Sequence, residues 1–167
     1  MVHGSEREFE RIYLEYSGRV QQFLFRLSGD AGLTEEMTQE TFFQAYRSLH
    51  RYRGECGMLT WLISIAKNVF LHELRKSRRE VLSADAILEE LAAPEEEQPG
   101  YQTIRHSEIE RVRKAIADLP ARYADVLVLR VYGDVPYEQI AARLGISVSS
   151  AKVIYFRAKQ KLREALE

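Results

Sequence analysis

Apolar residues recur at spacings of three and four along most of this 167-residue chain, and no run alternates apolar with polar residues as a half-buried strand would. This periodicity predicts an all-α protein. The chain is long enough for one domain or for two small ones. The expected helices are Glu6–Leu27, Thr34–Leu49, Met58–Arg79, Arg105–Leu119, Ala121–Tyr132, Tyr137–Leu144 and Val148–Leu166.

One stretch interrupts the helical pattern and divides the chain. It contains Pro94, Pro99 and Gly100, and residues 80–99 carry seven acidic side chains and no basic one. Such a composition is typical of a solvated connector. We therefore expect two small helical domains, residues 1–80 and 105–167, joined by a flexible acidic linker over residues 81–104 that includes a short helix at Asp85–Leu91.

Basic residues are concentrated on both sides of that linker, although the net charge of the whole chain is only −1. Residues 51–79 hold seven basic and two acidic side chains, and residues 143–163 hold six basic and no acidic ones. Two basic blocks separated by an acidic one predict two surfaces that face polyanions.

The C-terminal basic block lies in the segment PYEQIAARLGISVSSAKVIYFRAKQKL. Gly145 can adopt the left-handed conformation that ends a helix, Ser147 can cap the next helix, and Ala141 allows a close helix crossing. This is the spacing of a helix-turn-helix. An ordinary helical hairpin with a solvated basic face is the alternative.

A helical projection sorts the side chains of the last helix. The inward set is Ala151, Ile154, Ala158, Leu162 and Ala165, and the outward set is Ser149, Lys152, Val153, Phe156, Gln160 and Arg163, with Arg157 on the flank. Short polar groups and a lysine near the start of such a helix can meet base edges in a major groove, while arginines reach phosphates. The helix is therefore expected to contact duplex DNA.

The central basic block combines an aromatic ring with polar and basic groups on one helical face. The expected buried stripe is Leu59, Leu62, Ile63, Ala66, Phe70 and Leu74, and the opposite face holds Trp61, Asn68, His72, Arg75 and Arg79. Just before this helix, Gly54 and Gly57 permit a tight loop that carries Arg51, Tyr52 and Arg53. Such a face suits single-stranded nucleic acid, because an aromatic ring can stack on an unpaired base while basic side chains bind the phosphate backbone. Packing of Trp61 against another helix is the alternative, and His72 has no further ligand at a metal-binding spacing.

The helix before this block combines acidic side chains with an exposed phenylalanine. Its expected core side is Met37, Thr41, Phe42, Ala45 and Leu49, and its outer side is Glu36, Gln39, Glu40, Phe43 and Arg47. The outer side resembles a protein-binding patch. A catalytic pair of Glu36 and Glu40 lacks an accompanying nucleophile, phosphate loop or metal cluster, so no enzyme activity, cofactor or metal is expected.

The single cysteine, Cys56, excludes an internal disulfide and is expected to be a small buried or loop residue rather than a reactive thiol. No secretory leader is recognisable, and the longest apolar run, WLISIA, is too short to cross a bilayer. We expect a cytoplasmic protein without membrane insertion.

Three segments taken together resemble the bacterial sigma-70 family, and in particular its small extracytoplasmic-function (ECF) group. EEMTQETFFQAYRSL resembles the polymerase-binding part of region 2. RGECGMLTWLISIAKNVFLHELRKSRR resembles the part of region 2 that opens and reads the −10 element. LPARYADVLVLRVYGDVPYEQIAARLGISVSSAKVIYFRAKQKLR resembles region 4, which binds the −35 element.

The resemblance implies roles for particular residues. It implies contact with core RNA polymerase for Glu36, Gln39, Glu40, Phe43 and Arg47, contact with the melted −10 strand for Tyr52, Arg53, Trp61, Lys67, Asn68, His72 and Arg75, and contact with the duplex −35 element for Ser149, Ser150, Lys152, Val153 and Arg157. It also implies an anti-sigma factor as a partner.

The sequence departs from the family pattern at three places. Ser149–Ser150 replaces the usual glycine–threonine, and Val153–Ile154 replaces serine–arginine, which removes an expected phosphate contact. Val153 and Phe156 then face thymine methyl groups or a protein. His72 or Glu73 stands where an aspartate is common. The competing hypotheses are a stand-alone helix-turn-helix regulator, which would need no single-strand face, and an interaction module with altered DNA surfaces.

Overall fold

The computed structural model describes the backbone of residues 2–91 and 101–167, and the side chains of residues 5–80 and 107–167. The described residues form helices and no strand, which confirms the all-α prediction. The elements are α1 (Val2–Ser28), α2 (Ala31–Ser48), η1 (Leu49–Arg51), α3 (Met58–Leu91), α4 (Tyr101–Asp118), α5 (Ala121–Val131), α6 (Tyr137–Leu144) and α7 (Val148–Leu166).

Helix ends differ from the sequence prediction at several places. α2 begins three residues early because the Asp30 carboxylate accepts a hydrogen bond of 2.9 Å from the Leu33 amide and caps the helix. α3 does not end at Arg79 but continues to Leu91, since neither proline nor glycine interrupts the chain between these residues. Residues 81–91 of the expected linker are therefore helical, and residues 92–100 lie outside the described residues.

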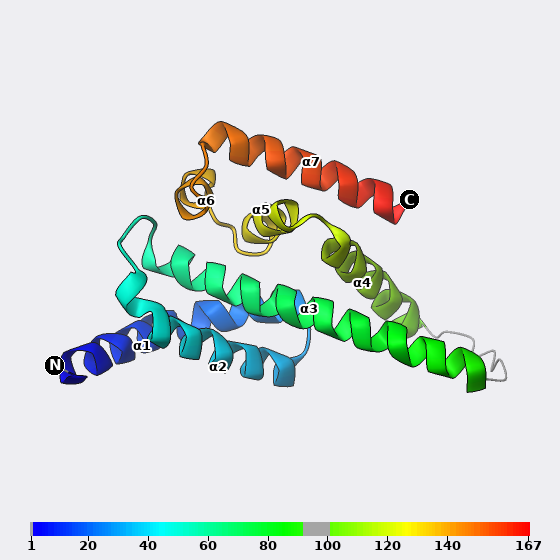
Figure 1. Cartoon of the computed structure of the whole chain (residues 1–167), viewed down its shortest axis with the longest axis horizontal. Helices are drawn as coiled ribbons and strands as arrows, with labels where there is room; N and C mark the ends of the chain where they lie inside the picture. The colour runs from blue at the N-terminus through cyan, green and yellow to red at the C-terminus, as the bar shows by residue number, and fades with distance from the viewer. Residues whose placement is uncertain (1, 92–100) are drawn as a thin grey trace.

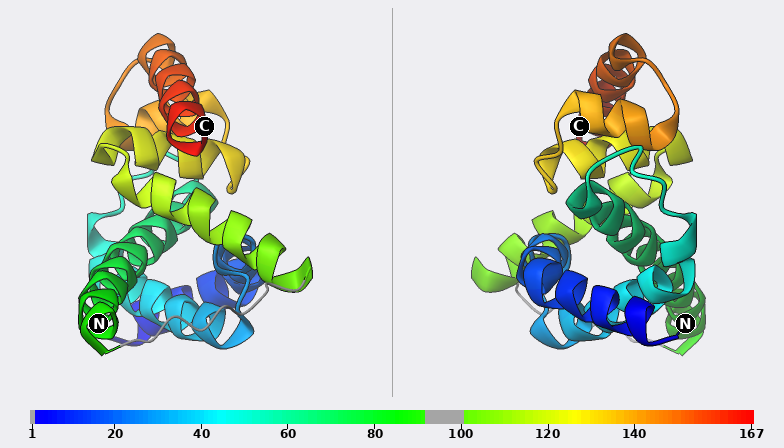
Figure 2. Two further views of the ribbon diagram at one scale, coloured as in Figure 1. Left: turned by 90° about the vertical axis from the view of Figure 1, so that its right-hand side faces the viewer. Right: turned by 90° about the vertical axis from the view of Figure 1, so that its left-hand side faces the viewer.

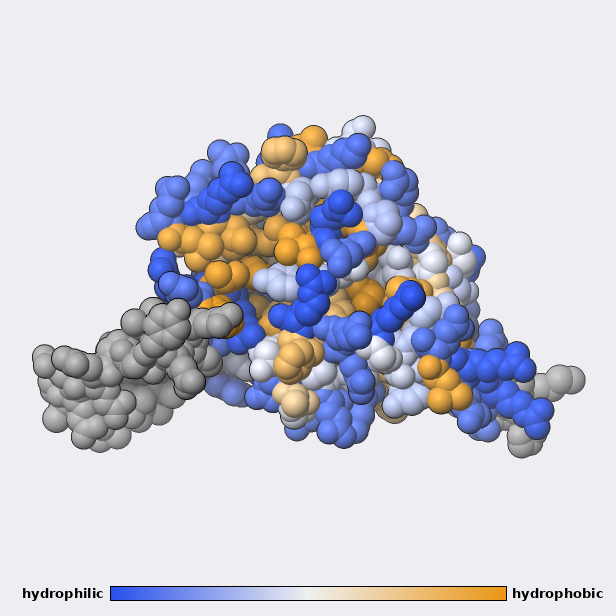
Figure 3. Space-filling model, turned by 180° about the vertical axis from the view of Figure 1, so that it is seen from behind, coloured by the Kyte–Doolittle hydropathy of each residue, from blue (hydrophilic) through white to orange (hydrophobic). Residues whose placement is uncertain are grey.

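The helices form two stacked groups, with α1–α3 below and α5–α7 above, and α4, which leads up to α5, is counted with the upper group (Figure 1). α3 runs along the boundary, where it contacts α1 and α2 on one side and α4, α5 and α6 on the other. The end-on views show the same stacking (Figure 2). Seen from behind, hydrophobic side chains are visible between the upper and lower groups (Figure 3).

The centre of the fold is a stretch of α3 that is buried around its whole circumference. All eight residues from Thr60 to Lys67 are buried, although an amphipathic helix would leave about half of them in solvent. The upper group supplies part of this cover. Gly133 approaches so closely that a Cβ there would lie 3.2 Å from Ile63 Cγ2 and 2.8 Å from the Leu129 carbonyl oxygen.

Polar contacts join the two groups at four further places. Gln139 Oε1 accepts a hydrogen bond of 2.7 Å from the Gly57 amide. Arg26 donates to the Tyr132 carbonyl oxygen over 2.8 Å and pairs with Asp134. Arg113 of α4 donates to the Leu27 carbonyl oxygen over 3.0 Å, and Arg78 forms an ion pair with Asp118.

The most buried of the contacts between the groups is an ion pair. Lys67 Nζ lies 3.0 Å from Asp125 Oδ1 of α5, and only 4% of the Lys67 side chain is exposed against 25% for Asp125. Burial lowers the pKa of the Lys67 ammonium, and the adjacent carboxylate acts in the opposite direction. The pair therefore matters chiefly because either partner alone would be a buried, uncompensated charge.

We predict that Asp125→Asn separates the upper helices from α3. Loss of one partner of a buried pair costs about 3–5 kcal/mol, and the lower end applies because Asp125 is partly exposed. The radius of gyration, measured by small-angle X-ray scattering, should increase while the helical circular dichroism signal is retained.

The double variant Lys67→Met with Asp125→Leu is the matched control, because it removes both charges and leaves an apolar contact. It should stay as compact as the wild type. An Asp125→Asn variant with unchanged compactness and unchanged stability would contradict this account of the pair.

Candidate polymerase and nucleic-acid surfaces

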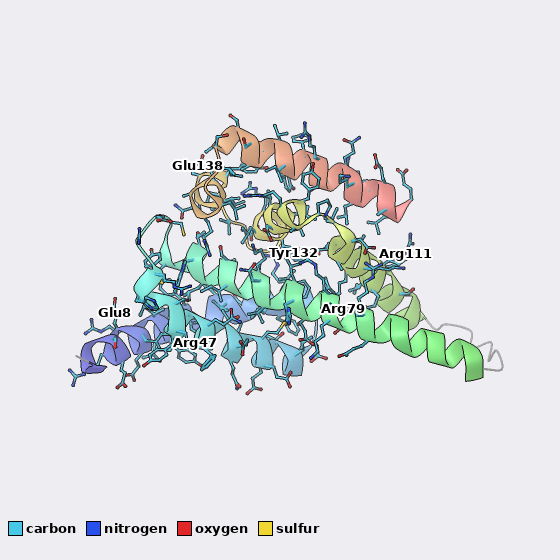
Figure 4. The ribbon with its side chains drawn as sticks, viewed as in Figure 1. Glu8, Arg47, Arg79, Arg111, Tyr132 and Glu138 are labelled. Carbon is cyan, nitrogen blue, oxygen red and sulfur yellow. The ribbon has the colours of Figure 1, made fainter. Side chains whose placement is uncertain are left out.

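The outer side of α2 is exposed as the sequence pattern predicts. Glu36, Gln39, Glu40, Phe43 and Arg47 are all exposed, while Met37, Thr41, Phe42 and Ala45 are buried. We call the five exposed residues the α2 patch. Phe43 keeps 55% of its surface in solvent, and the Arg47 guanidinium carbon lies 5.6 Å from the centre of its ring. Arg47 points away from the upper helices, whereas Tyr132 lies between α5 and α3 (Figure 4).

The expected −10 residues do not form one exposed stripe. Asn68 and His72 are exposed and line a hollow of 530 Å³ between α2 and α3, together with Glu36 and Glu40 of the α2 patch. Tyr52, Arg53 and Trp61 line a different hollow of 290 Å³, to which Arg143 of α6 also contributes. Arg75 is half-buried further along α3.

Two of the expected −10 residues, Trp61 and Lys67, are buried, and for Trp61 this contradicts its expected place on the outer face of the helix. Trp61 is 8% exposed and packs beside Tyr52, with ring centres 5.2 Å apart. Lys67 is 3% exposed because α5 covers it and Asp125 neutralises it. The sequence projection used a single amphipathic face, whereas this part of α3 is enclosed by helices from both groups.

The loop before α3 is fixed by a tyrosine–backbone contact. The Tyr52 hydroxyl donates a hydrogen bond of 2.6 Å to the Cys56 carbonyl oxygen, and burial is the main cause that raises the pKa of Tyr52. Burial also raises the pKa of the Cys56 thiol, with a smaller opposing influence from Arg143. A buried thiol that stays protonated is a poor nucleophile, as expected from the sequence.

α6 and α7 have the geometry predicted for a helix-turn-helix. Gly145 ends α6 with a φ of 68°, and the Ser147 hydroxyl accepts a hydrogen bond of 3.0 Å from the Ser150 amide at the start of α7. Ala151 and Ala158 are fully buried. Ala165, in the last turn of α7, is exposed instead of inward.

The outward face of α7 is open to solvent. Ser149, Ser150, Lys152, Val153 and Arg157 are all exposed. The ammonium of Lys152 lies 5.8 Å from the centre of the Tyr137 ring, and the Arg130 guanidinium carbon lies 4.7 Å from the same ring. Tyr137 of α6 thus holds two cations beside the first turns of α7, an arrangement suited to an anionic ligand.

The sequence analysis missed several residues that join the two groups, among them Asp125 and Gln139, and it missed Arg143, which lines the hollow beside Trp61. Each lies far along the chain from its partner on α3 or the preceding loop, and no local pattern connects them. The only feature of the sequence that points to them is the chemical type of the side chains they must pair with. A lysine in the expected apolar stretch Leu62–Phe70 requires a carboxylate, but the sequence does not show which one.

Among the described side chains, those of residues 5–80 and 107–167, no group of three or more from histidine, cysteine, aspartate and glutamate could hold a metal ion. In that same part of the chain, no helix is long and apolar enough to span a membrane.

Comparison with known proteins identifies both groups of helices. The family model "Sigma-70 region 2" matches residues 12–80, and "Sigma-70, region 4" matches residues 109–162. The chain is 30% identical over 155 residues to the ECF RNA polymerase sigma factor SigM of Bacillus subtilis, and the aligned stretch covers 92% of each chain. It is 31% identical over 166 residues to the RNA polymerase sigma factor CarQ of Myxococcus xanthus, covering 98% of this chain and 91% of the relative.

A solved structure shares the fold. The sigma factor RpoE, in a complex with the anti-sigma factor NepR from Bartonella quintana, superimposes with a TM-score of 0.56 at 24% identity over 96% of this chain and 97% of that chain. The chain therefore belongs to the sigma-70 family of RNA polymerase sigma factors. Within the family it is a member of the ECF group.

The capping hydrogen bond of α7 gives a prediction about stability. Ser147→Ala removes the acceptor for the Ser150 amide and should lower the free energy of unfolding by about 1 kcal/mol. Chemical denaturation followed by circular dichroism measures the change. Ser149→Ala is the control, because Ser149 is exposed only two residues further on and its replacement should change stability by less than about 0.5 kcal/mol. Equal effects of the two variants would contradict the capping role.

Proposed function

We propose that this protein binds core RNA polymerase through the α2 patch, directs it to promoters through −35 and −10 elements and promotes strand opening, without itself being a catalyst. The observation that carries the proposal is the presence of both sigma regions in one chain, with the α2 patch and the outward face of α7 exposed together. Because polymerase is the partner, the site of action is the cytoplasm. ECF membership extends the proposal to an anti-sigma factor.

The domain boundaries form part of the proposal. Residues 1–80 act as region 2 and residues 105–167 act as region 4, with the segment between them as a connector. The matched ranges 12–80 and 109–162 fit within these limits and support them. α3 continues past residue 80, so its last turns belong to the connector in this division.

Contact of the buried −10 residues Trp61 and Lys67 with promoter DNA requires that the two groups of helices separate. Lys67 contributes to −10 binding only after Asp125 moves away from it, because only 4% of the Lys67 side chain is exposed in the closed arrangement. Arg53, Asn68 and His72 are already accessible to a nucleic acid, and Tyr52 and Arg75 are partly so. We therefore propose that Arg53, Asn68 and His72 act first and that Trp61 and Lys67 follow the departure of α5 and α6.

The stand-alone regulator is less well supported, because such a protein needs neither the α2 patch nor a region 2. The interaction module is also less well supported, because the basic outward face of α7 remains exposed beside Tyr137 and its two cations. Run-off transcription with core polymerase on a genomic promoter library tests the whole function. Promoter-specific transcripts that depend on this protein are expected.

For polymerase binding, we predict that Glu40→Lys combined with Phe43→Ala lowers the affinity for core polymerase at least tenfold, because one change reverses a charge and the other truncates an exposed apolar anchor. Co-purification and surface plasmon resonance measure the loss. Glu164→Lys on α7 is the control for a charge reversal outside the patch and should bind normally. Unchanged binding by the double variant would remove the α2 patch from this role.

For strand opening, Asn68→Ala and His72→Ala should reduce open-complex formation while core binding stays normal. Both side chains are exposed, so neither change leaves a cavity, whereas Trp61→Ala would disturb the buried centre. Permanganate footprinting measures opening, and Ser77→Ala on the same helix is the control. A promoter with a pre-melted −10 bubble should relieve any melting defect, while a loss of base recognition should persist. Wild-type opening by both variants would rule out this use of α3.

A further inference from the structure

The outward face of α7 carries two exposed apolar side chains among polar and basic ones. Val153 has 46% of its surface in solvent and Phe156 has 74%. Three residues apart on one helix, they lie on the same face. The inward side of α7 is already filled by Ala151 and Ala158, so neither Val153 nor Phe156 is needed for packing within the fold.

The surroundings of this pair favour an anionic partner. Lys152 and Arg157 flank the two side chains, and residues 143–163 include six basic and no acidic residues. Val153 stands next to Lys152 on this face, whereas lysine is depleted at the apolar centre of protein–protein interfaces. A DNA major groove offers a small apolar group to such side chains, because thymine alone among the four bases presents a methyl group there.

We propose that Val153 and Phe156 contact thymine 5-methyl groups in the −35 duplex and thereby select thymine at the positions they face. This inference rests on the proposed function, because it requires α7 to lie in the major groove of the −35 element. Val153 lies in the second turn of α7, close to the end where a recognition helix meets base edges, and Phe156 lies one turn further along.

The chemistry distinguishes this mode of selection from a hydrogen-bonded one. Neither side chain can donate or accept a hydrogen bond, so neither can read the O4 of thymine or the amino group of adenine or cytosine. The selection depends on the methyl group alone. Burial of one such group corresponds to about 0.8 kcal/mol, which is about a fourfold change in affinity.

Replacement of thymine by deoxyuridine is the direct test, because deoxyuridine keeps every base-pairing and groove hydrogen bond and lacks only the methyl group. The holoenzyme, formed from this protein and core polymerase, first selects −35 sequences from a duplex library randomised at that element. Each thymine of the selected duplex is then replaced singly, and dissociation constants are measured by fluorescence anisotropy at one fixed salt concentration.

For the wild-type holoenzyme, deoxyuridine should weaken binding about fourfold at one or two positions. Val153→Ala should remove the effect at one position and Phe156→Ala at a neighbouring one. Lys152→Ala is the matched control. It should weaken binding to the thymine and deoxyuridine duplexes by the same factor, because its contacts do not include the methyl group. Thermal unfolding checks that the exposed-site variants remain folded.

Four results would overturn the inference. If wild-type holoenzyme binds the selected −35 duplex without any deoxyuridine effect, methyl selection is wrong while the proposed function stands. If the effect persists in both variants, other residues read the methyl groups. If Val153→Ala and Phe156→Ala weaken binding to core polymerase instead of DNA, the pair contacts protein. Selection of no −35 sequence at all would instead reject the −35 part of the proposed function, and the inference with it.

Discussion

The complete burial of α3 between Thr60 and Lys67 is the constraint on which the rest of the structure depends. Eight consecutive buried residues require protein on every side of a helix, and one group of helices cannot provide it. α1 and α2 cover one side, and α4, α5 and α6 approach the other. The position of the C-terminal helices, the closeness of Gly133 to Ile63 and the enclosure of Lys67 all follow from this requirement.

The contacts that hold the two groups together combine apolar packing around Ile63 with several polar contacts, and the polar ones favour reversible closure. Gln139, Arg26 and Arg113 reach backbone groups of the opposite group, and Lys67 pairs with Asp125. Each of these groups can regain hydrogen bonds from water when the helices part, so separation costs less than the exposure of a fully apolar interface would. A sigma factor that must present region 2 and region 4 to distant promoter elements benefits from such an interface.

Sequence reasoning was most successful where a feature depends on neighbours along the chain. The bounds of α6 and α7 followed from Gly145 and Ser147, and the exposed side of α2 followed from its periodicity. It was wrong to place Trp61 on an outer face, and it did not reveal the burial of Lys67, which depends on Asp125 more than fifty residues further along the chain. It also ended α3 too early, because the acidic stretch that contains Pro94 and Pro99 indicates a linker, whereas no proline or glycine breaks the helix before Leu91.

The location of the single tryptophan has a practical consequence. Trp61 is the only indole in the chain, it is 8% exposed, and it borders the hollow that Arg143 of α6 also lines. An indole in a dry environment emits at shorter wavelength than one in water. Departure of α6 would hydrate this ring and shift its emission to the red. The molecule therefore contains its own optical reporter for the separation of its two halves, and no attached dye is needed to follow that motion in time.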